Sequence, residues 1–76
     1  MSLVLYHRID DPDSAAVRRR VVELALKSRI DFQNVDTEGA AAFAARGGRA
    51  VPALWDGVRL HEGRAAALAL LETLPR

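Results

Sequence analysis

The 76-residue sequence contains no cysteine. Without cysteine the chain has no disulfide bond, no thiolate ligand for a metal ion and no thiol pair for redox chemistry. Small secreted domains usually depend on disulfide bonds for stability, so this absence favours the cytoplasm. The first residues also lack the basic segment and apolar stretch of a secretory signal peptide.

Long apolar runs and a strong charge of one sign are missing as well. No stretch approaches the roughly 18 apolar residues that a membrane-spanning helix requires. The net charge of +1 gives no reason to expect binding to a nucleic acid or to a membrane. The basic run Arg18-Arg19-Arg20 goes round a predicted helix instead of forming a stripe on one face, so we interpret it as solvated.

The composition that remains is that of an ordinary globular domain. Half of the residues are hydrophobic and 28% are charged. At this length we expect one domain over residues 1–76, without internal repeats or linkers. Such a small domain buries only about 60% of the surface that its unfolded chain exposes, so we expect a small hydrophobic core.

The first half of the chain predicts a strand, a helix and a second strand. The apolar run Leu3-Val4-Leu5-Tyr6 favours a buried strand. Asp13 or Ser14 is expected to cap a helix of about four turns. The apolar face of this helix is predicted to contain Val17, Val21, Leu24 and Ser28. Alternating apolar and polar residues over 31–36 predict a half-exposed second strand.

A short alanine-rich helix is predicted next. Thr37 is placed to cap it, and Glu38 lies near its positive end. Its body is predicted to contain Ala40, Ala41, Phe43, Ala44 and Ala45. Gly47-Gly48 should end it, because glycine readily adopts the left-handed conformation found at helix C-termini.

The remaining residues predict a hairpin and a last helix. Residues 50–55 form the third strand, and Asp56-Gly57 is a typical two-residue turn into a fourth strand at 58–60. Pro75 ends the last helix. The inner face of that helix is predicted to contain Ala66, Ala67, Leu70, Leu71 and Leu74.

The element order is therefore βαβαββα, an α/β fold with a four-stranded mixed sheet. The first two strands form a parallel unit joined by a right-handed helical crossover, and the hairpin adds antiparallel strands. We expect three layers, with the first and last helices on one face of the sheet and the middle helix on the other.

Three stretches carry a resemblance to a known family. Gly47-Gly48-Arg49-Ala50-Val51-Pro52 is similar to Gly-Gly-x-Thr-Val-Pro, and Glu62-Gly63-Arg64-Ala65 is similar to Glu-Ser-Arg-Ala. Asp11-Pro12-Asp13-Ser14 lies in register with Cys-Pro-x-Cys. Over nearly its whole length the chain resembles thioredoxin-fold proteins, above all glutaredoxins and the N-terminal domains of glutathione transferases.

The resemblance implies a ligand site. A cis Val51-Pro52 bond would leave the Val51 backbone open to pair with the cysteinyl part of glutathione or with an extended peptide. The helix start at Gly63 and Arg64 would bind the γ-glutamyl carboxylate through free amides, although Gly63 lacks the hydroxyl or carboxyl group of the family's Ser or Asp. Arg8 would pair with the glycine carboxylate. The alternatives are an edge-strand proline, a plain helix start and a surface arginine.

Asp11 occupies the position of the family's nucleophilic cysteine. The helix N-terminus that lowers the pKa of a thiol also stabilises a carboxylate, so an ionised Asp11 is expected. An ionised aspartate is a poor proton donor and a weak nucleophile, and it repels a thiolate. Ser14, at the second cysteine position, does not replace a thiol. The sequence therefore excludes thiol–disulfide activity, and the alternative role of Asp11 and Asp13 is to cap the helix.

The remaining candidate residues favour structural roles. Tyr6 lies where some glutathione transferases hydrogen-bond the thiolate, but glutaredoxins also pack a tyrosine there. Trp55 and Phe43 are expected in the core. His7 and His61 lack a third ligand at metal-binding spacing, so no metal site is predicted and glutathione is the one small molecule implied.

Three functions compete at this point. The first is a non-catalytic module that holds glutathione or an extended peptide at the proline groove. The second is a glutathione transferase-like enzyme, for which a partner would have to supply the helical domain that follows in that family, since this chain ends at Arg76. The third is an interaction domain that forms a homodimer or binds a partner protein through a helix face or a sheet edge.

Overall fold

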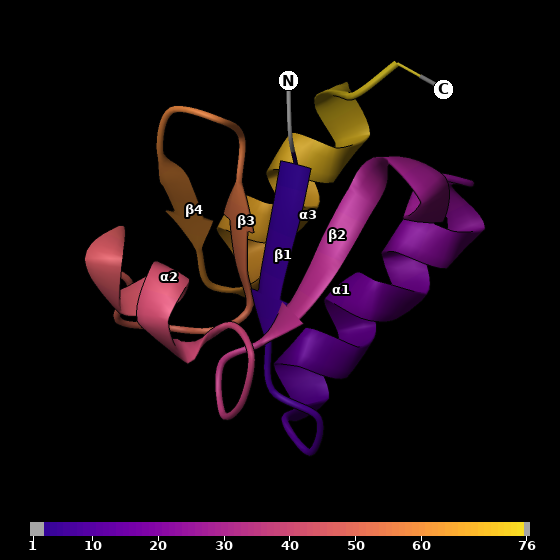
Figure 1. Ribbon diagram of the computed structural model, residues 1–76. Coiled ribbons are helices and arrows are strands. Elements are labelled where there is room, and N and C mark those ends of the chain that lie inside the picture. Colours follow the sequence, from indigo (N-terminus) through magenta and orange to yellow (C-terminus); the bar gives the residue numbers. More distant parts are fainter. Residues whose placement is uncertain (1–2, 76) are drawn as a thin grey trace.

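The computed structural model describes residues 3–75 and confirms the predicted fold class. Within these residues the elements are β1 (Leu3–His7), α1 (Pro12–Glu23), a 3₁₀ turn η1 (Lys27–Arg29), β2 (Ile30–Asn34), α2 (Ala40–Ala45), β3 (Ala53–Trp55), β4 (Leu60–Glu62) and α3 (Arg64–Thr73). This order is the βαβαββα succession of a thioredoxin-like fold (Figure 1).

The sheet is mixed, with strand order β2-β1-β3-β4. β1 runs parallel to β2, whereas β3 is antiparallel to both β1 and β4. Leu5 on the central strand β1 is opposite Phe32 on one side and Leu54 on the other. A parallel pair cannot be joined by a tight turn, so the chain crosses over through α1 between β1 and β2.

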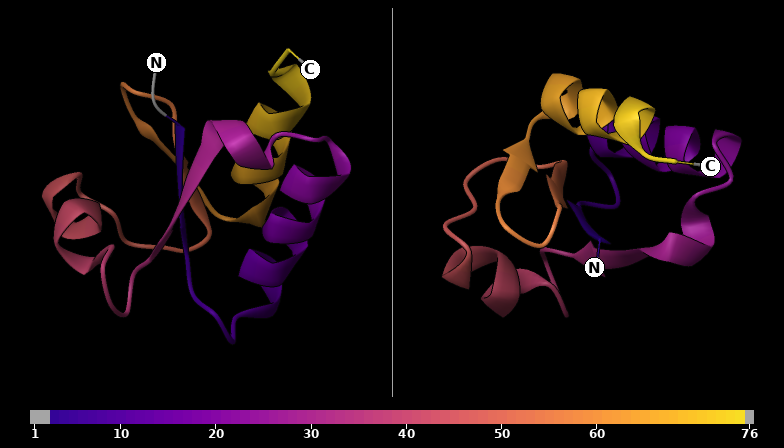
Figure 2. Two further views of the ribbon diagram at one scale, coloured as in Figure 1. Left: turned by 45° about the vertical axis from the view of Figure 1, so that its right-hand side comes forward. Right: turned by 90° about the horizontal axis from the view of Figure 1, so that it is seen from above.

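Helices cover both faces of the sheet, as predicted. α1 and α3 pack side by side on one face, and α2 lies on the opposite face (Figure 2). The larger core fills the space between the sheet and the α1–α3 pair. Its fully buried members include Leu5, Val17, Val21, Leu26, Leu54, Ala67 and Leu71. Burying each such leucine or valine contributes about 1.5–3 kcal/mol.

A second, smaller apolar cluster lies under α2. Tyr6 is almost fully buried there, and its ring centroid is 5.3 Å from that of Phe43. Trp55 packs against the same cluster and is covered by the Arg46 guanidinium, 4.0 Å from the ring centroid. The predicted packing roles of Tyr6, Phe43 and Trp55 are thus confirmed, although Phe43 and Trp55 are only half-buried.

The ends of α1 differ from the prediction. Asp11, the alternative cap that the sequence also offered, is the N-cap instead of Asp13 or Ser14, because its carboxylate accepts hydrogen bonds from the backbone and the hydroxyl of Ser14. Pro12 suits the first helical position, where no amide donor is needed. The helix stops at Glu23, before a left-handed Ala25. Ser28 is consequently exposed, and Leu26 enters the core instead.

The predicted cap of α2 is also wrong, whereas its predicted end is confirmed. Gly39 precedes the helix without a side-chain cap. The Glu38 carboxylate accepts instead from the Asn34 amide at 2.8 Å and from the Thr37 hydroxyl, which ties Thr37 into the preceding turn. At the other end Gly47 has φ +76°, and the Gly48 amide donates to the Phe43 carbonyl at 2.9 Å. This is a glycine-terminated helix end.

The hairpin is longer than predicted. Its connection covers residues 56–59, because one Asp56 carboxylate oxygen accepts from the Val58 and Arg59 amides at 2.8 and 2.9 Å. Aspartate commonly stabilises a turn in this way. The fourth strand therefore occupies 60–62 instead of 58–60, and the third strand is confined to 53–55. Val58 is 80% exposed at the turn.

No helix in the described part of the chain is long and apolar enough to cross a membrane; the longest, α1, has 12 residues.

Candidate functional site

The sequence-predicted site residues come together at one end of the molecule. We call this the lower end, after its place in Figure 1, and define it as residues 8–14, 49–52 and 62–65. β1 ends there, opposite the start of β3, and β3 in turn pairs with the end of β4. The helices α1 and α3 both begin there. Arg8, Asp11, Val51, Pro52, Gly63 and Arg64 all belong to this end.

The segment before β3 is held by the end of β4. One carboxylate oxygen of Glu62 accepts from the Arg49 and Ala50 amides at 2.7 and 2.9 Å. The Gly63 amide donates to the Pro52 carbonyl at 2.8 Å. The Val51–Pro52 peptide bond is cis. The segment is thus fixed on both sides of Val51.

Val51 itself has an unpaired backbone. Its N–H and C=O form no hydrogen bond with any other described residue, although its side chain is half-buried. Regular pairing with β4 starts only at Ala53. Buried backbone groups are nearly always paired with protein, water or ligand. A fixed segment with a free donor and a free acceptor is suited to pairing with an extended chain.

The start of α3 presents free amides beside this segment. Gly63 is the N-cap, with φ +89°, and no side chain caps the first turn. A Cβ atom at Gly63 would meet nothing within 4 Å, so the space beside the Gly63 Cα is open. The free amides and the helix dipole make such an end favourable for an anion. The Arg64 guanidinium is 3.4 Å from the Asp13 carboxylate in a half-exposed pair, an interaction of small net strength.

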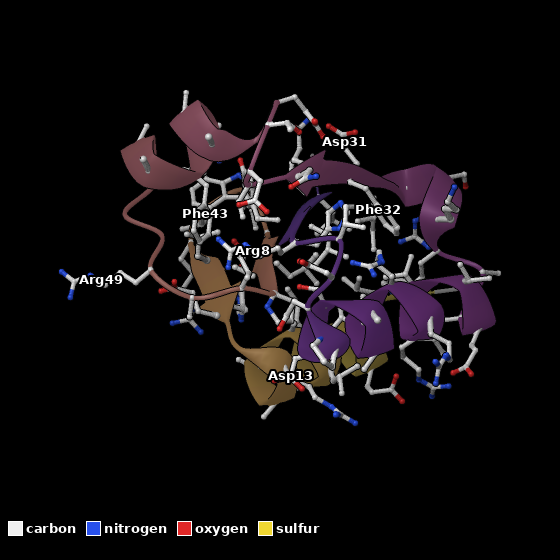
Figure 3. All side chains as sticks on the ribbon, turned by 90° about the horizontal axis from the view of Figure 1, so that it is seen from below. Arg8, Asp13, Asp31, Phe32, Phe43 and Arg49 are labelled. Carbon is white, nitrogen blue, oxygen red and sulfur yellow. The ribbon has the colours of Figure 1, made fainter. Side chains whose placement is uncertain are left out.

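Arg8 is already paired with a carboxylate. Its Nε lies 3.1 Å from both carboxylate oxygens of Asp36, and the two side chains are 46% and 54% exposed. Figure 3 shows Arg8 in the middle of the lower end, whereas Arg49 extends away from the molecule. A ligand carboxylate would have to compete with Asp36 for Arg8.

The two positions that align with the family's cysteines form a helix cap. The Asp11 carboxylate accepts from the Ser14 amide and hydroxyl, both at 2.8 Å. These bonds, the hydroxyl's first, lower the pKa of Asp11, so it is ionised at neutral pH. The fully buried Ser14 hydroxyl also accepts from the Arg8 amide at 3.2 Å. The pair contains no thiol, and the capping role offered for Asp11 as an alternative explains its geometry.

Replacing Asp11 with cysteine should produce a thiol of lowered pKa. The Ser14 donors and the start of α1 that now hold a carboxylate would stabilise a thiolate. We expect a pKa of about 7.5 or lower, against about 8.5 for an ordinary thiol. The ultraviolet absorbance of the thiolate, followed against pH, measures it. Asp10→Cys, in the exposed loop before the helix, is the matched control; equal pKa values for the two thiols would contradict the prediction.

Sequence reasoning missed the role of Arg18. Its Nη1 lies 3.0 Å from His7 Nδ1 and donates to the Arg8 carbonyl at 3.1 Å, and its Nη2 donates to the Ile9 carbonyl at 3.2 Å. Arg18 is therefore half-buried and fastens the loop after β1, so the interpretation of the whole basic run as solvated is wrong. The available signal was its spacing: Arg18 follows Ser14 by one helical turn and neighbours the buried Val17.

Glu62 was likewise not singled out, although it belongs to the Glu62-Gly63-Arg64-Ala65 motif. The amides of Arg49 and Ala50, in that order, lower its pKa from the ordinary value of 4.5. Its folded-state pKa is thus below the unfolded one. The resulting stabilisation is fully present above about pH 4.5 and is lost as the pH falls through the folded-state value.

Glu62→Gln is expected to lower the free energy of unfolding by roughly 0.5–1 kcal/mol at neutral pH, a value already reduced for solvent screening. The amide oxygen still accepts hydrogen bonds but carries no charge. The variant should also lose less stability than the wild type between about pH 7 and pH 3, because one titrating group has been removed. Urea unfolding at both pH values measures this difference. An unchanged pH dependence would show that Glu62 does not anchor the segment before Val51.

The histidines serve separate local structures. His61 Nε2 lies 2.8 Å from an Asp56 carboxylate oxygen and closes the hairpin, whereas His7 contacts Arg18. In the described residues, no three His, Asp or Glu side chains are grouped in a way that could hold a metal ion.

No known family model matches the chain, and a search of curated proteins also found no match. The fold and the geometry of the lower end are therefore the features from which a function can be inferred.

Proposed function

We propose that this chain is a non-catalytic thioredoxin-fold module that holds glutathione or an extended peptide along the Val51-Pro52 segment. The observation that carries the proposal is the unpaired N–H and C=O of Val51 on a segment that Glu62 and Gly63 fix from both sides. Because these 76 residues include no cysteine, the module binds its ligand without thiol–disulfide exchange.

The ligand would pair with Val51 as an additional short strand. Main-chain hydrogen bonds would supply affinity, as in other cases of strand addition. A ligand carboxylate would then meet the uncapped amides of α3 and the Arg64 guanidinium. An ammonium group on the same ligand end would be attracted by Glu62, which is ionised at neutral pH because its pKa is lowered. The γ-glutamyl end of glutathione carries both charges, which favours glutathione over an uncharged peptide.

The other residues of the lower end, Asp11 and Arg8, favour ligand binding without a chemical reaction. An ionised Asp11 disfavours a thiolate nearby, so a bound thiol stays protonated. Arg8 is engaged by Asp36, so the second carboxylate of glutathione gains little from it. We expect modest affinity, carried mainly by Val51 and the start of α3. A small domain without disulfide bonds suits a reducing compartment, and we propose the cytoplasm as its location.

A two-dimensional amide NMR titration with reduced glutathione and with S-methylglutathione tests the proposal. Shifts should cluster at Val51, Gly63 and Arg64 and should saturate equally for the two ligands, because no free thiol is required. No saturable shift at several millimolar of either ligand would refute glutathione binding. Preference for the free thiol would refute the binding mode.

The two arginines of the lower end should respond differently to substitution. Arg64→Ala is expected to weaken binding several-fold, because Arg64 is the first residue of α3, where a ligand carboxylate would lie, and its exposed pair with Asp13 at 3.4 Å holds the guanidinium only weakly. Arg8→Ala should leave the affinity within about twofold, because that guanidinium is neutralised by Asp36. The same titration measures both variants. A larger loss of affinity for Arg8→Ala than for Arg64→Ala would show that the ligand carboxylate binds Arg8 in place of Asp36.

A further inference from the structure

His7 is a buried histidine in direct contact with an arginine. It lies at the end of β1, is only 5% exposed, and presents its ring to Phe32 with the centroids 5.6 Å apart. Its Nδ1 is 3.0 Å from Arg18 Nη1. A guanidinium only donates hydrogen bonds, so Nδ1 must be the acceptor and the ring must be neutral. This contact cannot survive protonation of Nδ1.

A carboxylate in the turn after β2, that of Glu38, also acts electrostatically on His7. Glu38 is held there by the Asn34 amide at 2.8 Å and by the Thr37 hydroxyl. These bonds, the Asn34 bond first, lower the pKa of Glu38 to about 2, so it is charged at every pH at which a histidine titrates. His7 in turn contributes to the lowering, which indicates that the two groups interact electrostatically. A protonated His7 is therefore attracted by a fixed negative charge.

The Arg18 guanidinium also fastens the loop that follows His7. Nη1 is shared between His7 and the Arg8 carbonyl, and Nη2 donates to the Ile9 carbonyl at 3.2 Å. A guanidinium displaced from His7 by charge repulsion therefore also moves away from these two carbonyls. The loop at residues 8–11 carries Ile9, which is 63% exposed, and leads directly into the Asp11 cap.

We propose that His7 is a proton-operated switch for the loop at residues 8–11. Neutral His7 accepts from Arg18 and keeps the loop fastened; protonated His7 can no longer accept, repels the Arg18 guanidinium and releases it from the Arg8 and Ile9 carbonyls. The switch acts on the lower end of the molecule and is independent of whether a ligand binds at Val51.

The surrounding charges determine the direction of the switch. Burial and then Arg18 lower the pKa of His7 from 6.5, while the negative charge of Glu38 raises it. Arg8, the next residue, is neutralised by Asp36. Because the folded-state pKa is below the unfolded one, the fastened state is fully stable above about pH 6.5 and weakens as the pH falls through the folded-state value.

The experiment is an NMR pH titration of the intact chain from about pH 8 to about pH 4, the range over which histidine switches operate. It follows the ring nitrogens of His7, the carbonyl carbons of Arg8 and Ile9, and hydrogen exchange of the Arg18 guanidinium. The carbonyl signals should move with the His7 midpoint, below 6.5. Guanidinium exchange, corrected for its intrinsic pH dependence, should rise roughly tenfold, as expected for the loss of two ordinary hydrogen bonds. If the chemical shifts of the Arg8 and Ile9 carbonyl carbons do not change over the pH range in which His7 titrates, the proposal is wrong.

Two variants separate the switch from a merely structural histidine. In His7→Gln the amide oxygen can still accept from Arg18 but does not titrate, so the carbonyl signals should stay constant with pH. Glu38→Gln keeps an acceptor for the Asn34 amide but removes the anion, so the His7 midpoint should move to lower pH. The proposal is contradicted if the carbonyl signals of His7→Gln still change with pH as they do in the wild type. It is also contradicted if the His7 midpoint in Glu38→Gln stays the same or moves to higher pH. If His7→Gln does not fold, the Glu38→Gln midpoint decides.

Discussion

Leu54→Ala is expected to lower the free energy of unfolding by about 2–5 kcal/mol. Leu54 is fully buried on β3, between Leu5 of β1 and His61 of β4, in the core shared with α1 and α3. Truncating it removes apolar burial and leaves a cavity that strands on both sides keep from collapsing. A domain of this size has a total stability of only roughly 4–11 kcal/mol, so the variant should be close to unfolding.

Urea unfolding, followed by circular dichroism, measures this effect. Val58→Ala is the matched control, because Val58 is 80% exposed in the hairpin turn and should change the stability by less than about 0.5 kcal/mol. Similar losses for the two variants would contradict the position of β3 in the centre of the core.

Val51→Pro is expected to weaken ligand binding by about tenfold or more while leaving the fold intact. Proline lacks the backbone N–H that would pair with the ligand, and that N–H donates to no described residue in the free protein. The loss of one main-chain hydrogen bond, together with an acceptor left unpaired on the ligand, accounts for the expected change. Titration with S-methylglutathione measures the affinity, and thermal unfolding establishes that the variant is folded.

Val51→Ala is the control for this variant. It shortens the half-buried side chain but keeps the backbone donor, so its affinity should stay within a few-fold of the wild type. If Val51→Pro bound as tightly as Val51→Ala, the backbone of Val51 would not be the recognition element.

The regular elements could be predicted because their signals are local. The apolar run from Leu3 to Tyr6 and the helical spacing of Val17 and Val21 follow directly from which side chains must reach the core. The glycine pair 47–48 marks a helix end through its backbone conformation alone. These features are sufficient for the element order, and the order leaves few ways to build a sheet.

The element boundaries were less predictable because short polar side chains compete for the same amides. Asp11 and Asp13 are both good caps, and only the structure shows that Ser14 donates to Asp11. Asp56-Gly57 is a strong signal for a two-residue turn. The Asp56 carboxylate binds two later amides instead, and the fourth strand shifts by two residues.

The backbone part of the candidate site could be predicted, whereas its side-chain pairs could not. Val51, Gly63 and Arg64 were placed through motifs that describe main-chain geometry. The pairing of Arg8 with Asp36 joins residues 28 positions apart, and that of Arg18 with His7 joins residues 11 apart. Such pairs depend on how α1 and the turn after β2 pack around the end of β1, which no local pattern encodes.

The most direct test of ligand pairing at Val51 is amide hydrogen exchange at this residue, measured with and without saturating S-methylglutathione. In the free protein the Val51 N–H has no partner among the described residues, so it should exchange fast. A ligand paired with Val51 should slow this exchange markedly, whereas exchange of the Gly63 amide, already bonded to the Pro52 carbonyl, should change little. Unchanged, fast exchange at Val51 under saturation would contradict the proposal that this backbone holds the ligand.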